Sequence, residues 1–195
     1  KYEDCSFIVC HIDGGISVSA HRKGRIIDCN DAAGGDGPYT PTRIGSVSVA
    51  DILEYVRDKD IDEVKKLCTR TGGFVSHFGT PSSDTVHKMA EEGNRKAVRV
   101  WNGMKYQIVK YIGAMAAVLG GRVDGILLTG GLLRFEDIAQ TIREQCEWIA
   151  PVSLYPGEVE HEAMAAGALR VLRGEEEPKR YTGRPVWDGW HDEDE

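Results

Sequence analysis

The chain has 195 residues, of which 41% are hydrophobic, so it can bury one substantial core and is not a disordered chain. Its formal net charge is −7, which disfavours binding to nucleic acid or to an anionic membrane. Part of the acidic excess lies in the last four residues, which we expect to form a solvated tail. Its 5 scattered cysteines, without a CxxC pair, argue against a disulfide framework or thiolate metal site and favour a reducing cytoplasm. No apolar run approaches the ~18 residues that span a bilayer, and no signal segment opens the chain.

The first thirty residues predict an antiparallel meander. Short apolar strands are expected at 7–11, 16–21 and 25–29. The gaps contain Asp13-Gly14-Gly15 and Arg22-Lys23-Gly24, and glycine supplies the positive φ that tight hairpin turns require. Residues 30–46 are rich in glycine and proline and predict a long loop, of a kind that is usually functional inside a compact domain.

Helical patterns dominate the chain after this loop. Ser48 and Asp51 suit the start of a helix through about residue 57, and residues 61–69 predict a second one. Apolar side chains then recur at steps of three and four from Val98 to Leu119, which predicts a long helix with one buried face. A strand (123–128), a helix (135–149), a strand (152–155) and a helix (158–172) complete the predicted order.

This order predicts an α/β domain of the ribonuclease-H-like class. Its mixed sheet joins the three-stranded antiparallel meander to parallel strands, and helices cover it. We expect residues 1–174 to form this domain and residues 175–195 to form a partly disordered tail. The chain begins almost at a strand, as a polypeptide cut between two domains would.

A glycine pair and an arginine loop are the first candidate site features. Gly14 and Gly15 leave backbone amides open to a phosphate chain, although such a hairpin is also a common simple turn. The loop at 35–45 holds Arg43 on a segment bounded by prolines. A fixed guanidinium there can clamp a transferring phosphoryl or carboxylate oxygen, or pair with a surface carboxylate.

Two further features follow near the carboxyl end. Gly130 and Gly131 break a buried strand before a helix, where nucleotides bind in α/β folds. Glycines also commonly separate a strand from a helix without any ligand. Glu160 and Glu162 lie in the first turn of the last helix. Acids there complement the helix dipole, or they hold Mg²⁺ near a nucleotide.

Several segments in register resemble the C-terminal half of butyrate kinases, which belong to the acetokinase family in the superfamily of sugar kinases, heat-shock chaperones and actin. They are residues 11–15, 37–43, 72–75, 106–108, 113–119, 129–131 and 149–174. The motifs at 21–25 and 169–174 are more similar to butyrate kinase than to acetate kinase. The order and spacing hold from about residue 7 to residue 174.

The resemblance implies ATP-dependent phosphorylation of butanoate, or of a branched short-chain acid, to an acyl phosphate and ADP, with Mg²⁺. Arg43 would steady the transferring phosphoryl group, and Glu162, or alternatively Glu160, would lie near the metal. A turn at 71–80 would flank the base or ribose. The positions implied to bind nucleotide are His11, Asp13, Gly14, Gly15, His77, Gly79, Gly130 and Gly131.

The resemblance also implies partners that this chain lacks. An N-terminal domain of the same enzyme would supply a second phosphate loop, another arginine and most of the acid-binding pocket, so we expect the chain alone to be inactive. A homodimer through this half is also implied. Two alternatives stay open: half of an acetate or propionate kinase, and a catalytically silent nucleotide-binding or assembly module. The second rests on Asp13, where the family usually has glycine, and on Ile44, where it usually has serine.

Overall fold

The computed structural model describes residues 1–157, 160–178, 180 and 183. The chain divides into two compact units, residues 1–158 and residues 159–195. The predicted tail from residue 184 onward lies outside the described residues, and the predicted boundary at residue 174 stays a prediction.

The first unit opens with the predicted meander. Strands β1 (Ser6–Ile12), β2 (Ile16–Arg22) and β3 (Arg25–Cys29) pair antiparallel in sequence order. Lys23 and Gly24 both have positive φ, 49° and 76°, which is the backbone of the tight hairpin turn that their sequence predicts. The Asp13-Gly14-Gly15 turn differs from the prediction, because neither glycine has a positive φ; this turn is closed by a hydrogen bond from the Asp13 amide to the Gly15 carbonyl over 3.0 Å.

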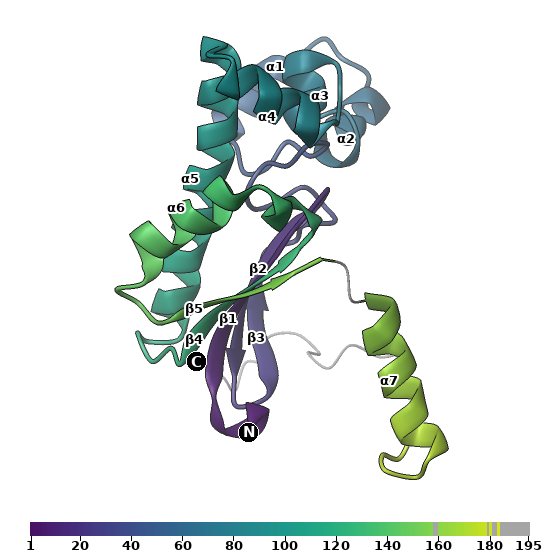
Figure 1. The fold of residues 1–195 in the computed structure, drawn as a ribbon. Coiled ribbons are helices and arrows are strands. Elements are labelled where there is room, and N and C mark those ends of the chain that lie inside the picture. The colour runs from purple at the N-terminus through teal and green to yellow at the C-terminus, as the bar shows by residue number, and fades with distance from the viewer. Residues whose placement is uncertain (158–159, 179, 181–182, 184–195) are drawn as a thin grey trace. The chain divides into compact units, whose positions relative to one another are not determined.

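A mixed sheet of five strands confirms the predicted fold class. β4 (Gly125–Gly130) pairs parallel with β1, and β5 (Val152–Pro156) pairs parallel with β4, in the order β3-β2-β1-β4-β5. Because β1, β4 and β5 run in the same direction, their carboxyl ends meet at one edge of the sheet (Figure 1). The predicted glycine pairs follow or end these strands at that edge.

The core lies between the sheet and helices α5 (Arg95–Val118) and α6 (Glu136–Cys146). α5 contacts β1 and β2, and α6 contacts β5. The predicted apolar face of α5 is buried from Trp101 to Leu119, whereas Val98, which begins the predicted stripe, is 37% exposed. The alternate residues Ile8, Cys10 and Ile12 of β1 pack beneath this layer with no exposed surface.

Four helices stand between β3 and α5. They are α1 (Val49–Val56), α2 (Ile61–Thr69), α3 (Gly73–Phe78) and α4 (Ser83–Glu91). α1 and α2 were predicted, but residues 71–80, predicted as a turn, contain α3, and α4 was not predicted. The four helices gather near the amino-terminal end of α5 (Figure 1).

The second unit contains α7 (Glu160–Leu172), which has no buried residue. Short 3-10 turns at Tyr2–Asp4 and Gly131–Arg134 complete the regular structure of the described residues. No helix in the described part of the chain has the length and apolar character needed to cross a membrane.

Candidate functional site

The arginine loop, residues 30–46, has a fixed base. The buried Asn30 side chain accepts a hydrogen bond from the Val18 amide over 2.7 Å and donates to the Asp36 carbonyl over 3.0 Å. Near the other end, Ser46 Oγ donates to Asp36 Oδ1 over 2.7 Å. This last hydrogen bond is the main cause that lowers the pKa of the Asp36 carboxyl. Both ends of the loop are therefore tied together and to β2.

The stretch that carries Arg43 is held by its own backbone and by α5. Thr40, which is 1% exposed, accepts at Oγ1 from the amides of Arg43 (3.0 Å) and Thr42 (3.2 Å). The Tyr39 amide donates to Gln107 Oε1 over 2.8 Å, and its hydroxyl donates to a carbonyl of α5. Burial raises the pKa of Tyr39 to about 12, so the hydroxyl stays a donor at neutral pH. The backbone around Arg43 is thus rigid.

The side chain of Arg43 reaches the first hairpin. A Cβ atom on Gly15 would lie 2.9 Å from the guanidinium carbon of Arg43, so a side chain at Gly15 would displace the guanidinium. Thr42 Oγ1 donates to the Gly14 carbonyl over 3.4 Å. The buried Nε of Arg43 has no hydrogen-bond partner among the described residues. The arginine side chain and the hairpin therefore lie against each other, and the arginine loop contacts the hairpin through Thr42 as well.

Asp13 joins this hairpin to the second glycine pair. Its Oδ1 accepts from the Gly14 amide over 2.7 Å, and its Oδ2 accepts from the Gly131 amide over 3.0 Å. Gly130, with a φ of 108°, lies against the backbone of Ile12, where a Cβ would overlap the carbonyl. The hairpin, the arginine loop and the Gly130-Gly131 strand end thus meet at one edge of the sheet. The Asp13 carboxylate uses amides that an anionic phosphate would also need.

Three other residues predicted to bind the nucleotide are His11, His77 and Gly79. His11 is half-buried near the end of β1 and pairs in register with Thr129 of β4. His77 is on α3 and lines a cavity together with Ile44. Gly79 ends α3 with a left-handed φ of 72°. Their assignment to a nucleotide stays a prediction.

The predicted metal ligands belong to the other unit. Glu160 and Glu162 lie in the first turn of α7, so their relation to the glycine pairs stays a prediction. Among the described residues, no group of three or more His, Cys, Asp or Glu side chains could hold a metal ion. Mg²⁺ that enters with a nucleotide needs only one or two carboxylates beside the phosphates, so it does not require such a group.

An ion pair beside Gly131 was not predicted. Arg134 donates from Nη1 to the Gly131 carbonyl over 2.9 Å and from Nη2 to Asp84 Oδ2 over 3.0 Å. Its hydrogen bonds lower the pKa of the Asp84 carboxyl. The pair joins α4 to the turn after β4. The two residues are separated by 50 positions, so no local pattern could have indicated the contact.

A second unpredicted cluster fixes α6 to α5. Asp137 Oδ2 accepts from Trp101 Nε1 and from Lys105 Nζ, both over 2.8 Å. The His87 ring lies 4.8 Å from the Trp101 ring, centroid to centroid. Because partly buried ion pairs depend on good geometry and further hydrogen bonds, this cluster specifies how the helices pack. It also holds the helix that follows the Gly130-Gly131 turn.

The sequence profile described as the acetokinase family matches residues 1–167. The chain belongs to the acetokinase family. Acetokinase relatives with solved structures have the same fold. Acetate kinase from Porphyromonas gingivalis is 21% identical with a TM-score of 0.79, and the match covers 88% of this chain and 50% of that one.

Two further solved structures agree. Acetate kinase from Entamoeba histolytica is 14% identical with a TM-score of 0.76, covering 87% of this chain and 52% of that one. A propionate kinase from Francisella tularensis is 21% identical with a TM-score of 0.66, covering 73% and 38%. This acetokinase chain therefore spans about half the length of the acetate kinases that it matches. These three structures confirm the predicted fold class, and they do not decide which acid this chain acts on.

Proposed function

We propose that this acetokinase chain is the nucleotide-binding C-terminal half of a carboxylate kinase of the butyrate kinase type. The reaction would transfer the terminal phosphoryl group of ATP to butanoate, or to a branched short-chain acid, giving an acyl phosphate and ADP. The observation that carries the proposal is the meeting of the hairpin, the arginine loop and the second glycine pair at one sheet edge.

Arg43 is the residue that we assign to the reacting phosphoryl group. Phosphoryl transfer requires positioning and charge neutralisation more than covalent chemistry. The Arg43 guanidinium has no acidic partner among the described residues, and its backbone is immobilised by Thr40. A fixed and unneutralised cation is suited to stabilise charge that develops during transfer.

ATP and Mg²⁺ are the proposed cofactors. The family resemblance assigns Gly14, Gly15, Gly130 and Gly131 to phosphate and adenosine contacts. The Cβ position of Gly14 has no atom within 4 Å, so a ligand can approach the main chain there, whereas Arg43, Ile12 and Asp13 lie against the other three glycines. Mg²⁺ would neutralise the triphosphate, and a carboxylate at Glu162 or Glu160 would hold it. Magnesium-dependent ATP binding, measured by titration calorimetry with and without EDTA, tests this assignment.

We further propose that the chain alone does not phosphorylate acids. The test is an acyl-hydroxamate assay on the chain alone and after mixing with a separately produced N-terminal half of a butyrate kinase. We expect activity only in the mixture, and highest with butanoate or isobutanoate rather than with acetate or propionate. A rate in the isolated chain comparable with that of whole butyrate kinases would refute the proposal. Preference for acetate would reassign the substrate.

One observation favours a second candidate, a catalytically silent nucleotide-binding or assembly module. The Asp13 carboxylate already accepts the amides of Gly14 and Gly131, and a carboxylate beside ATP phosphates would repel them. Calorimetry separates the two candidates. Micromolar, Mg²⁺-dependent ATP binding supports the kinase half, whereas millimolar or absent binding supports the silent module.

A homodimer through this half is also proposed from the family resemblance, and a cytoplasmic location from the scattered cysteines. Light scattering after size-exclusion chromatography tests the dimer, with a monomer mass of 21.5 kDa as the reference. A concentration-independent monomer would contradict it.

A further inference from the structure

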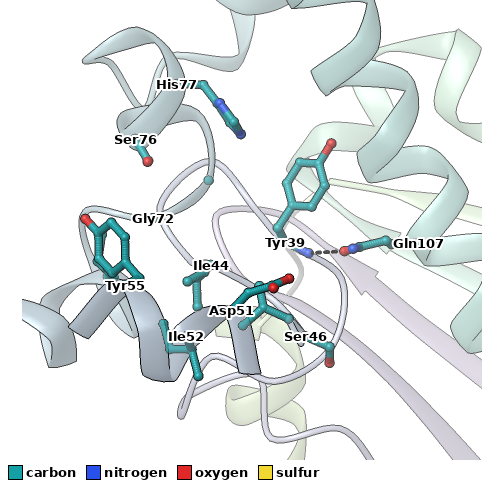
Figure 2. A pocket seen from close by; sticks show the side chains of 13 residues that line it. Tyr39, Ile44, Ser46, Asp51, Ile52, Tyr55, Gly72, Ser76, His77 and Gln107 are labelled. Carbon is teal, nitrogen blue, oxygen red and sulfur yellow. Dashed lines mark hydrogen bonds between the residues drawn. The ribbon is translucent and has the colours of Figure 1, made fainter. Parts of the chain in front are cut away.

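A cavity of about 410 Å³ lies between the arginine loop and helices α1 to α3. Its walls are mainly apolar and include Ile44, Ile52, Leu67 and the rings of Tyr39 and Tyr55. Figure 2 shows Tyr55 on one side of the space, Tyr39 on the other, and His77 above them. Pockets of this volume with apolar walls and a few polar groups suit a compact organic ligand.

The charge of the cavity lining selects against anions. Asp51 is the one residue among those lining the cavity that carries a formal charge at pH 7, and no Lys or Arg lines it. Burial, and then the nearby cation of Lys96, lower the pKa of His77, so the imidazole is neutral at pH 7. Lys96 itself donates from Nζ to the His77 carbonyl over 2.5 Å and lies over the Phe78 ring. The lining therefore has a net charge of about −1, carried by the exposed Asp51 carboxylate.

We propose that this cavity binds a primary amine with a compact apolar body. The ammonium group would lie at Asp51, and the apolar body would lie against Ile44 and the Tyr55 ring. A protonated amine gains attraction from the Asp51 carboxylate, whereas a phosphate or carboxylate would be repelled by it. Lys59 Nζ already lies over the Tyr55 ring, 4.5 Å from its centroid, so we assign this ring an apolar contact and no cation–π interaction with the amine. The ligand class thus differs from the anions proposed for the Arg43 face, and the proposal does not depend on that function.

The cavity shares its walls with the backbone that holds the arginine loop. The Ile44 amide donates to the Leu67 carbonyl over 3.1 Å, and the Gly72 amide donates to the Thr42 carbonyl over 3.0 Å. Ile44, Leu67 and Gly72 all line the cavity. A bound amine would therefore restrict the same hydrogen bonds that fix the loop, and this restriction can be measured without any activity.

The first test compares three ligands of one shape and different charge. Titration calorimetry on the full chain at pH 7.5 would use 2-phenylethylamine, 2-phenylethanol and 3-phenylpropionate. We expect the amine to bind about tenfold more tightly than the alcohol, by the attraction of one near-surface charge pair, and the acid to show no binding. Equal affinities for the three, or no binding of the amine, would overturn the proposal.

Two matched variants locate the interaction. Asp51→Asn removes the charge in the first turn of α1 and should abolish the preference for the amine over the alcohol. Asp62→Asn makes the same change in the first turn of α2, outside the cavity lining, and should leave the preference intact. Both side chains are exposed, so neither change endangers folding. A preference that survives Asp51→Asn would sink the assignment.

Hydrogen exchange provides an independent readout. The amine should slow exchange of the backbone amides of Ile44 and Gly72, and it should not do so in the Asp51→Asn variant. Binding that leaves these amides unprotected would place the amine elsewhere and overturn the proposal. Competition of the amine by ATP would also overturn it, because the two ligands are assigned to different faces of the loop.

Discussion

The two faces of the arginine loop have opposite chemistry. On the hairpin face, the Arg43 guanidinium lies against Gly15, and Asp13 of the same hairpin accepts hydrogen bonds from the Gly14 and Gly131 amides. On the helix face, Ile44 lines an apolar cavity in which Asp51 is the charged group. Neighbouring residues on one short segment therefore serve two environments.

One loop can therefore contribute to two sites of different chemistry, because the residues that surround each face decide which ligand it favours. The same hydrogen bonds, from the Arg43 amide to Thr40 Oγ1 and from the Ile44 amide to the Leu67 carbonyl, support both faces. The electrostatic difference comes from the residues that surround each face: hairpin amides on one, and α1 to α3 on the other. Each face can then be altered separately, and four changes follow in order of expected effect.

The largest effect is expected for Arg43→Ala. Removing a cation that stabilises transferred charge should lower acyl phosphate formation about 10³-fold or more in the chain complemented with an N-terminal half. The acyl-hydroxamate assay measures it. Arg22→Ala is the control, because Arg22 is an exposed residue that donates to the Val118 carbonyl away from the loop. A loss of less than tenfold would show that Arg43 does not contact the phosphoryl group.

The second change is at Gly73, which packs against the arginine loop and so supports both of its faces. Gly73 has a φ of 55°, and a Cβ there would overlap the Thr40 carbonyl oxygen. Gly73→Ala should therefore reduce the free energy of unfolding by about 3 kcal/mol. Gly79→Ala is the matched control, since Gly79 has a φ of 72° but no atom within 4 Å of its Cβ position. It should cost only about 1 kcal/mol.

Urea unfolding followed by circular dichroism gives both free energies. Equal losses for Gly73→Ala and Gly79→Ala would mean that only the positive φ matters. The close packing of Gly73 on the arginine loop would then not contribute to stability.

The third change tests the hairpin face. Asp13→Gly removes the carboxylate that occupies the Gly14 and Gly131 amides. If that carboxylate repels nucleotide phosphates, ATP should bind at least about fivefold more tightly, which corresponds to ~1 kcal/mol for one screened charge. Calorimetry with ATP and Mg²⁺ measures the change, and Asp13→Asn separates charge from the loss of the acceptor. Weaker binding in both variants would instead make Asp13 a ligand of the metal–nucleotide complex.

Parts of the molecule with strong local patterns were predictable. The Lys23-Gly24 turn has the backbone that its glycine predicts, and steps of three and four along α5 set its buried face from Trp101 to Leu119. The five-stranded mixed sheet follows from that order of elements. The hairpin, Arg43 and the second glycine pair were expected to lie close together, and their contacts at one sheet edge agree with that expectation, whereas their role in binding stays a prediction.

Other parts depend on contacts that no local pattern encodes. α3 has only six residues and begins at Gly73, whose conformation is imposed by packing on the arginine loop. The residues that line the cavity come from the arginine loop and from α1, α2, α3 and α5, so its apolar character is not visible along the chain. Asp84 and Arg134 likewise meet only through the fold. His77 could be named from its position in a motif, but its place in the cavity could not.

The smallest effect concerns His77 on the helix face. Burial lowers its pKa below the ordinary value of 6.5, so the folded chain binds this proton less readily than the unfolded chain. The stability that follows is fully present above pH 6.5, and it is lost progressively as the pH falls from about 6.5 through the lower pKa of the folded state. His77→Gln should therefore flatten the fall in urea stability between about pH 7 and 5, with His21→Gln measured alongside because burial also lowers the pKa of His21. An unchanged slope in His77→Gln would mean that the imidazole titrates in water and is not part of the cavity wall.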